Sequence, residues 1–346
     1  MTKKYAGIDR FRMAAALMIA AIHTAPFAVI SERTDFVVTY CLFRVGVPFF
    51  FMVTGFFVLS AYWDGDDKKL WRYLGKMTGI YLAATLLYLP LNLYAGKQIQ
   101  GAGTFFRVLL FDGTFYHLWY LPAVILGCVI TGLLYRILGF YGSGAAAFLL
   151  YGIGTLGDSY FGLISRWPVG KAFYDGIFTC SEYTRNGIFF APLFLWMGAA
   201  LRQREPGEAA ENDRGKYVLP AGLLFSAAFM VLEGLYTYDS GWQKHNSMYF
   251  LLPAVMYFLF RLLLAAKGGV RGGYRDLSLW IYLIHPICIV LIRGAAKAAG
   301  LTKILVDHSL IHYLAVCLAS LAGAYVICRI LTVWKRAAKR GTKSDA

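Results

Sequence analysis

The sequence has too little charge for a single soluble core. Only 15% of its 346 residues are charged, whereas 59% are hydrophobic and the mean hydropathy is +0.56. A soluble domain carries roughly a quarter of charged residues. Uncharged apolar runs recur instead along the chain without the alternation of a β-barrel, and a helix needs about 20 such residues to cross a bilayer. The sequence therefore predicts an all-α integral membrane protein, a bundle of about ten transmembrane helices.

The sequence also lacks the residue spacings of metal and disulfide sites. Its six cysteines include no C-x-x-C pair, and its six histidines are scattered along the chain. We therefore expect no metal site. Every cysteine except Cys180 falls in a predicted span, where a thiol behaves as a small hydrophobic group. No disulfide framework is implied.

The net charge of +15 would suggest a nucleic-acid partner in a soluble protein. Here the basic residues sort by membrane face. With the N-terminus inside, 23 of the 34 Lys and Arg lie at the inner face, ten lie at the outer face and Arg44 lies within a span. This is the positive-inside distribution. We therefore expect a multi-pass protein of the bacterial cytoplasmic membrane with both termini in the cytoplasm. Its expected partner is the lipid bilayer, and no nucleic-acid partner is expected.

The predicted spans are apolar windows joined mostly by short loops. They cover residues 7–29, 38–62, 73–95, 117–135, 144–162, 186–201, 217–236, 247–264, 277–297 and 309–333. Residues 1–336 are expected to form one transmembrane domain with a hydrophilic inner linker at about 202–216. Residues 337–346, which are rich in Lys and Arg, are expected to form a disordered cytoplasmic tail.

The first predicted span carries an arginine and a histidine on one face. Arg12 and His23 are eleven residues apart, which is almost three helical turns and about 16 Å along the axis. Arg12 lies near the inner boundary and His23 in the outer half. Ionisable residues inside lipid are costly, so both are functional candidates. Alternatively, Arg12 extends to the inner headgroups and His23 hydrogen-bonds a neighbouring helix.

The second predicted span places Arg44 about two turns below the outer surface, at nearly the depth of His23. A guanidinium keeps its charge, so it needs an anion, carbonyl groups or water at that level. We expect Arg44 and His23 to line one polar cavity open to the outer face. The alternative is that Arg44 extends outward to the headgroups.

Six further candidates for an acceptor or substrate cavity share the outer ends of the fourth and sixth spans. They are His117, Trp119, Tyr120, Glu182, Arg185 and Asn186. The two aromatic residues suit an interface belt as well as a ligand platform. The charged pair at the sixth span is also what a solvated ion pair would look like.

Two more positions remain open between structural and functional roles. His285 lies near mid-membrane before Pro286, so it either belongs to the acceptor cavity or satisfies the carbonyl groups that the proline frees. Lys69, Arg72 and Lys76 form one basic stripe where the third span begins. That stripe suits anionic lipid headgroups or a phosphate-rich soluble ligand.

Taken in order, these segments resemble the acyltransferase-3 family of membrane acyltransferases. Arg12-x10-His23 resembles the family's first-helix motif. FFFMVTGFF (49–57) is similar to its F-F-x-x-S-G-[FY] signature, with Thr54 at the usual serine position. HLWYL and LSLWIYLIHP resemble its later conserved helices. The resemblance covers essentially the whole chain and implies a ten-helix acyltransferase-3-like domain over residues 1–336.

The resemblance also implies roles for particular residues. In the family, the histidine matching His23 is thought to serve acyl transfer from acyl-CoA to a hydroxyl on the far side of the membrane. Basic residues matching Arg12 and the Arg72 region are thought to hold the CoA phosphates. This implies acyl-CoA, acetyl-CoA in particular, as a donor substrate, with no permanently bound cofactor and with Lys76 beside Arg72. One departure is that members often carry R-x-x-R entering helix 3, where this chain has Arg72, Lys76 and Gly79.

A narrower resemblance is to the membrane module of the VanT-type serine racemases of vancomycin-resistance operons. DRFRMAAALMIAAIH, YHLWYLPA and TRNGIFFAPLF are among the matching segments. In those proteins the module precedes a cytoplasmic pyridoxal-phosphate racemase domain and is linked to serine uptake. The resemblance implies a separate membrane subunit, a stand-alone relative or a trimmed piece of a longer protein, with a cytoplasmic serine racemase as partner.

Two functional hypotheses follow. The first is a membrane acyltransferase that moves an acyl group from cytoplasmic acyl-CoA to a small or cell-envelope hydroxyl acceptor, with His23 as general base or transient acyl carrier. The second is a serine-uptake module in which His23 and Arg44 line the path and Arg44 faces the substrate carboxylate. The Arg12 and His23 pair favours the first, because it suits CoA better than a zwitterion.

Overall fold

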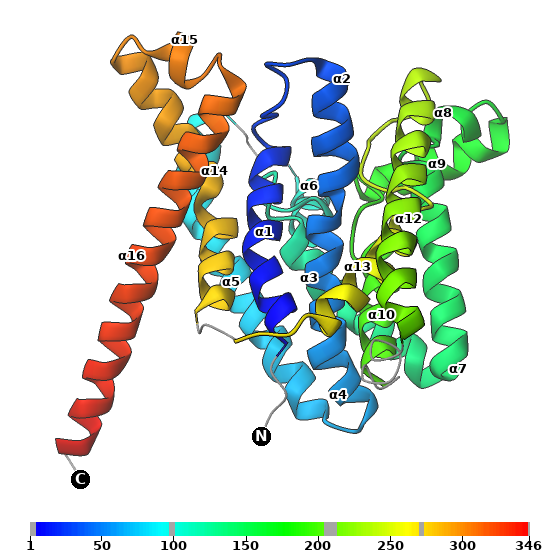
Figure 1. The fold of residues 1–346 in the computed structure, drawn as a ribbon, viewed down its shortest axis with the longest axis horizontal. Helices are drawn as coiled ribbons and strands as arrows, with labels where there is room; N and C mark the ends of the chain where they lie inside the picture. The colour runs from blue at the N-terminus through cyan, green and yellow to red at the C-terminus, as the bar shows by residue number, and fades with distance from the viewer. Residues whose placement is uncertain (1–4, 97–100, 204–212, 270–272, 345–346) are drawn as a thin grey trace. The chain divides into compact units, whose positions relative to one another are not determined.

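The computed structural model describes residues 5–96, 101–203, 213–269 and 273–344. Every regular element in these ranges is a helix (Figure 1). The chain divides into two compact units, one formed by residues 1–46 and 266–346 and the other by residues 47–265. Most of the predicted inner linker, residues 204–212, lies outside the described residues.

The first unit combines the two ends of the chain. Its elements are α1 (Ala6–Ile22), α2 (Glu32–Asp35), the π-helix η1 (Phe36–Cys41), the 3₁₀ turn η2 (Leu42–Val45), α14 (Tyr274–Ala298), α15 (Thr302–Leu305) and α16 (Ser309–Ser344). Helix α14 packs against both α1 and α16 (Figure 1). A buried apolar layer of Ala16, Ile281 and Ala324 joins the three helices. Residues near the two chain ends therefore share one core.

The second unit contains the middle of the chain. Its elements are α3 (Gly46–Thr54), η3 (Gly55–Leu59), α4 (Ser60–Trp63), α5 (Asp67–Tyr94), α6 (Ala102–Arg107), η4 (Val108–Asp112), α7 (Tyr120–Gly157), α8 (Phe161–Ile164), α9 (Pro168–Cys180), α10 (Ala191–Gln203), α12 (Asp213–Asp239) and α13 (Leu252–Ala265). Helix α10 packs on α7 and η3, and α12 packs on α13. The carboxylate of Asp66 accepts the Lys69 backbone N–H at 3.0 Å, which caps the start of α5.

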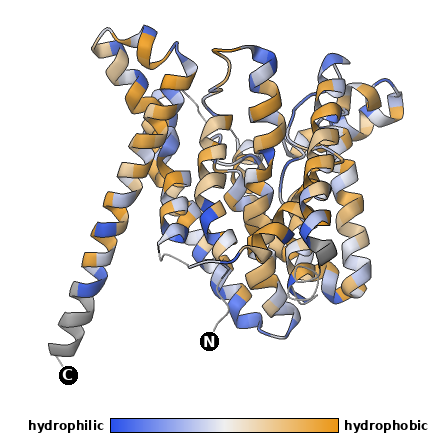
Figure 2. Ribbon diagram, viewed as in Figure 1, coloured by the Kyte–Doolittle hydropathy of each residue, from blue (hydrophilic) through white to orange (hydrophobic). Residues whose placement is uncertain are grey.

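Six helical segments are long and apolar enough to cross a membrane. They are residues 32–63, 67–94, 120–157, 216–239, 274–298 and 309–336. Hydrophobic residues dominate these helices (Figure 2). This confirms the predicted all-α, multi-pass membrane fold. Each of the ten predicted spans overlaps helix, but the count of ten stays a prediction.

Several predicted boundaries differ from the observed ones. The spans predicted at 117–135 and 144–162 correspond to two helical stretches of α7 that meet at Gly139, where φ is +68°, so a single residue stands where a longer loop was predicted. Loops predicted at 96–116 and 163–185 contain the short helices α6 and α9. The last helix continues to Ser344, into the stretch predicted as a disordered tail, because its Lys, Arg and Ala residues favour helix.

The first helix is shorter than the predicted span 7–29. It ends at Ile22, and the chain turns at Ala25, whose φ is +47°, before Pro26. A proline disfavours helical geometry at the residue before it, and positive φ is strained for alanine. His23 therefore sits at the end of α1 rather than inside a continuous span.

The glycine of the FFFMVTGFF segment lets two helices touch backbone to backbone. A Cβ atom added to Gly55 would collide with the carbonyl oxygen of Leu195, and one added to Gly198 would collide with that of Met52. Small residues permit such close approach between membrane helices. Gly55 and Gly198 thus fix how η3 crosses α10.

Gly55→Ala should lower the free energy of unfolding by about 1–3 kcal/mol, since overpacking a tight contact costs that much. Gly75→Ala in α5 is the matched control, because a Cβ there meets no atom within 4 Å. Thermal unfolding of the two purified variants checks this. Equal stability of both variants would contradict the assigned contact.

Reporter fusions test the predicted orientation of the chain. A reporter placed after Lys216 should read as cytoplasmic, and one near Lys171 should read as external, because 23 of the 34 Lys and Arg fall on the predicted inner face. The reverse pattern would overturn either the span count or the orientation.

Candidate functional site

The two ionisable residues of α1 keep the spacing that the sequence predicts. Arg12 lies in the second turn of the helix, and His23 forms its C-terminal cap. The side chain of Arg12 is only 13% exposed, and its Nε lies 3.3 Å from Oδ1 of Asp9. His23 is half-buried. Eleven residues of helix separate the two groups by about 16 Å along the axis.

A second histidine lies against His23. The rings of His23 and His285 are stacked, with centroids 5.4 Å apart and planes inclined by 22°. The His285 side chain comes from α14 and is fully buried. No spacing in the sequence connects positions so far apart in the chain. Only the packing of α14 on α1 brings the two rings together.

His285 is held by its own helix. Its Nδ1 lies 2.9 Å from the carbonyl oxygen of Tyr282 and 3.2 Å from that of Ile281. Pro286 has no N–H, so it cannot donate the helical hydrogen bond to Tyr282 that this position normally supplies. The imidazole replaces the missing donor. Of the two interpretations that the sequence left open for His285, satisfying a freed carbonyl is the one that the contacts describe.

The segment after His23 is anchored by a buried carboxylate. Asp35 of α2 accepts the Phe27 backbone N–H at 3.1 Å and the Thr39 hydroxyl at 2.8 Å through the same oxygen. Ser309 at the start of α16 accepts from the Val29 backbone N–H at 3.0 Å and donates to the Pro26 carbonyl at 3.1 Å. These contacts fix the turn that follows the end of α1.

Arg44 is connected to the same end of α1 by the side chain of Tyr40. Its guanidinium carbon lies 5.2 Å from the centroid of the Tyr40 ring, and the Tyr40 hydroxyl donates to the Ile22 carbonyl at 3.4 Å. Arg44 is half-buried in η2. In a regular α-helix, the ring of Pro48 would clash with the carbonyl group of Arg44. The helix is accordingly irregular at Arg44, where η2 is a 3₁₀ turn. A shared cavity of Arg44 and His23 stays a prediction.

The basic residues predicted to contact CoA on the third span lie on α5. Arg72 and Lys76 are both exposed in the second unit. Between them, the Tyr73 hydroxyl lies 2.9 Å from the hydroxyl of Thr54, at the threonine of the FFFMVTGFF segment. This bond links that segment to α5, the helix that carries the basic stripe.

The residues of the HLWYL segment lie among aromatic rings. His117 is only 1% exposed, and its ring centroid lies 4.9 Å from that of Tyr88. The ring centroids of Trp119 and Phe190 lie 6.1 Å apart, and those of Tyr120 and Phe51 lie 5.0 Å apart. His117 was predicted as part of an acceptor cavity, and it is a buried group within this aromatic cluster.

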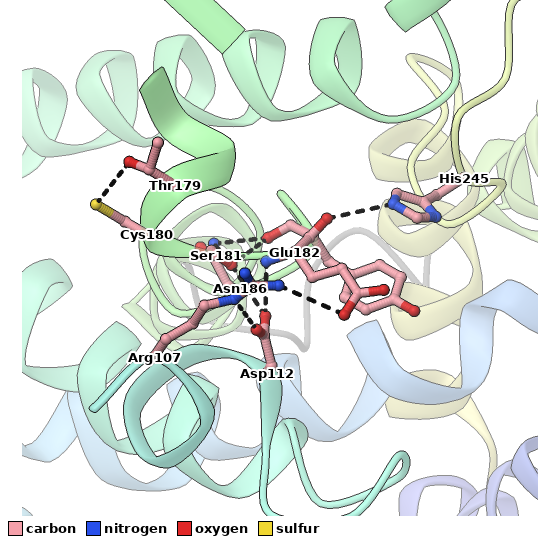
Figure 3. Close-up of polar contacts among 9 residues, drawn as sticks. Arg107, Asp112, Thr179, Cys180, Ser181, Glu182, Asn186 and His245 are labelled. Atoms are coloured by element: carbon pink, nitrogen blue, oxygen red, sulfur yellow. Dashed lines mark hydrogen bonds and ion pairs between the residues drawn. The ribbon is translucent and has the colours of Figure 1, made fainter. Parts of the chain in front are cut away.

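Glu182 and Asn186 belong to a polar cluster that joins α6 and η4 to the segment before α10 and to His245 (Figure 3). Arg107 pairs with Asp112 at 2.7 Å and with Glu182 at 3.5 Å. Asp112 also accepts the Glu182 backbone N–H at 2.9 Å. The Glu182 carbonyl lies 3.3 Å from His245 Nε2. Glu182 is thus part of a network with Arg107, which the sequence reasoning did not select.

Arg185 lies outside this cluster, and Asn186 also caps the chain ahead of α10. The Arg185 guanidinium lies 3.9 Å from the Tyr183 ring centroid and 5.2 Å from that of Trp119, and it donates to the Ser247 hydroxyl at 2.9 Å. The Asn186 side-chain oxygen accepts the backbone N–H of two residues ahead of α10. Burial raises the pKa of the Tyr183 phenol, against the opposing effect of Arg185. The phenol therefore stays neutral at physiological pH.

Two further carboxylates, those of the buried Asp158 and the half-buried Glu233, organise loops and were left unassigned from the sequence. Asp158 at the end of α7 accepts the backbone N–H groups of Ser247 at 2.6 Å and Met248 at 3.0 Å. Glu233 of α12 accepts those of Phe250 at 2.6 Å and Leu251 at 3.0 Å, at the start of α13. A carboxylate at a helix N-terminus is favourable. Within the described ranges, no group of three His, Cys, Asp or Glu side chains is arranged to hold a metal ion.

Comparisons with known proteins show the family of the chain. The family model for the acyltransferase domain, acyltransferase-3, matches residues 5–329. An amino-acid racemase of Enterococcus faecalis is 39% identical over the whole chain and 48% of its own length. A serine/alanine racemase of Enterococcus gallinarum is 35% identical over 96% of the chain and 47% of its own length. No solved structure matches the chain.

The fold is that of a multi-pass helical membrane protein whose first helix carries the ionisable residues Arg12 and His23. Within that class, the chain belongs to the acyltransferase-3 family. It spans about half the length of the curated relatives that it matches.

Proposed function

We propose that the protein transfers an acyl group, acetyl in the first instance, from cytoplasmic acyl-CoA to a hydroxyl acceptor at or across the membrane. The observation that carries this proposal is the placement of Arg12 and His23 about 16 Å apart along α1. A nucleotide phosphate at Arg12 leaves the pantetheine arm long enough to bring a thioester to His23. Membership of the acyltransferase-3 family supports the reaction class.

The chemistry assigned to His23 is general base catalysis or transient acyl transfer. As a base, the imidazole takes the proton of the acceptor hydroxyl while its oxygen attacks the thioester carbonyl. The carbon–sulfur bond then breaks, and the CoA thiolate takes up the proton. Alternatively, the imidazole carries the acyl group between donor and acceptor. Either route ends in an ester and free CoA.

Three basic residues are proposed to bind the CoA phosphates. Arg12 is largely buried beside Asp9, so an incoming phosphate would compete for a guanidinium that is already positioned. Arg72 and Lys76 are exposed on α5 and can hold phosphate as point charges. The residues proposed for the acceptor side are those that the sequence suggests, namely Arg44, His117, Trp119, Tyr120, Glu182, Arg185, Asn186 and His285.

A second proposal is a serine-uptake subunit that works with a cytoplasmic serine racemase. The names of the amino-acid and serine/alanine racemases that this chain matches favour it. Arg44 would then face the substrate carboxylate, because its guanidinium lies over Tyr40 beside the end of α1. In this case His23 would line the path of serine and would not act on a thioester.

One assay separates the two proposals. Purified protein in proteoliposomes is given acetyl-CoA at the cytoplasmic face, and release of free thiol is followed with labelled serine uptake measured in parallel. Saturable thiol release that depends on a hydroxyl acceptor supports acyl transfer. Saturable serine uptake without thiol release overturns it and supports the uptake subunit.

A further inference from the structure

We infer that His285 is the positioning residue of His23. The inference rests on the proposed acyl transfer for its consequence, but the contact itself lies within one unit of the chain. In this role, His285 acts through the His23 ring that it stacks against.

The ring of His285 has one fixed orientation. Carbonyl oxygens only accept hydrogen bonds, so the contact of Nδ1 with the Tyr282 carbonyl places the hydrogen on Nδ1 of the neutral ring. Pro286 makes this bond necessary, because it removes the backbone donor that a helix would otherwise provide. A bond to its own helix and complete burial therefore lock the ring.

The locked ring then restricts His23. The two rings are stacked with centroids 5.4 Å apart and planes inclined by 22°, within the range of distances that aromatic pairs prefer. His23 stands at the end of α1, where the helix stops and a turn through Ala25 begins. The backbone at a helix end constrains a side chain less than a helix interior does, so the contact with His285 sets the direction of the imidazole. Orientation of a base matters because small misplacements cost rate.

Substitutions separate the stack from the hydrogen bond. His285→Phe keeps a ring beside His23 and loses the donor. His285→Asn keeps a donor for the Tyr282 carbonyl and loses the ring, and His285→Ala loses both. Where His285→Phe fails to fold, Pro286→Ala is added, since alanine restores the backbone N–H opposite the Tyr282 carbonyl.

The readouts are kcat and KM for acyl-CoA together with the rate at which diethyl pyrocarbonate modifies His23, measured by mass spectrometry. We expect His285→Ala and His285→Asn to lower kcat about 100-fold with KM changed less than about twofold, because a misplaced base affects the chemical step. Both should expose His23 to faster modification. His285→Phe should stay within about tenfold of the wild-type kcat and keep the slow modification.

Full kcat in His285→Asn with loss in His285→Phe would overturn the inference, because the role would then be the hydrogen bond alone. Unchanged kcat in all three variants would also overturn it. If the wild-type protein transfers no acyl group, the proposed function fails, and modification of His23 still decides. Faster modification in the Ala and Asn variants alone supports the positioning role, whereas equal rates in every variant reject it.

Discussion

Replacing His23 with alanine should abolish acyl transfer while acyl-CoA still binds. The imidazole is the proposed base or acyl carrier, and loss of a general base lowers rates by about 10²–10⁴-fold. The phosphate site at Arg12 lies about 16 Å away along α1, so CoA affinity should change less than about twofold. Thiol release and equilibrium CoA binding, measured on the same preparation, check the two halves of this expectation.

His308→Ala is the matched control for that experiment. His308 is also half-buried in the first unit, and it accepts the Ile311 backbone N–H at 3.4 Å. It has no place in the proposed reaction, so its loss should leave transfer unchanged. Thermal unfolding of both variants shows whether each is folded. A folded His23→Ala protein with wild-type transfer would remove His23 from the mechanism.

Replacing Arg12 with alanine should weaken acyl-CoA binding by about 10- to 100-fold. A hydrogen bond to a charged group contributes about 1.5–3 kcal/mol, and each 1.4 kcal/mol is tenfold in affinity. Arg10→Ala is the control, because Arg10 is an exposed arginine two residues away, on a different face of α1. Titration of CoA into each variant in nanodiscs gives the affinities.

A comparison of Arg44→Ala with Arg12→Ala distinguishes the uptake proposal. Arg44→Ala should leave CoA affinity unchanged if Arg12 binds the phosphates. If the protein carries serine, Arg44→Ala should instead lower uptake more than Arg12→Ala, because Arg44 lies beside Tyr40 at the end of α1 where a carboxylate would pass. Equal CoA affinity in wild type and Arg12→Ala would contradict the phosphate assignment.

The membrane fold was predictable because long apolar runs leave a chain few other structures. Local spacing likewise placed Arg12 and His23 on one helix, because their relative position depends only on the periodicity of that helix. The pairing of His23 with His285 was not predictable, because it depends on how α14 packs on α1. The Arg107 network at Glu182 was missed for the same reason, because its members come from segments that are far apart in the sequence.

The end of α1 shows where reading the sequence fails in detail. Apolar composition continued past His23, so the predicted span ran to residue 29, but Pro26 and the strained backbone at Ala25 end the helix earlier. In α7, by contrast, the observed break is shorter than predicted. A single glycine, Gly139, accommodates a positive φ where the sequence predicted a longer loop. Backbone geometry at single residues set both boundaries.

Equilibrium binding of acetyl-CoA to the purified wild-type protein tests the central claim most directly. The proposed acyltransferase should bind it saturably from the cytoplasmic face, with a dissociation constant in the range of enzyme substrates, about 1 µM to 1 mM. Free CoA should compete, because the phosphates at Arg12 supply much of the contact. A protein that unfolds cooperatively on heating, and is therefore folded, yet shows no saturable acetyl-CoA binding would contradict the claim.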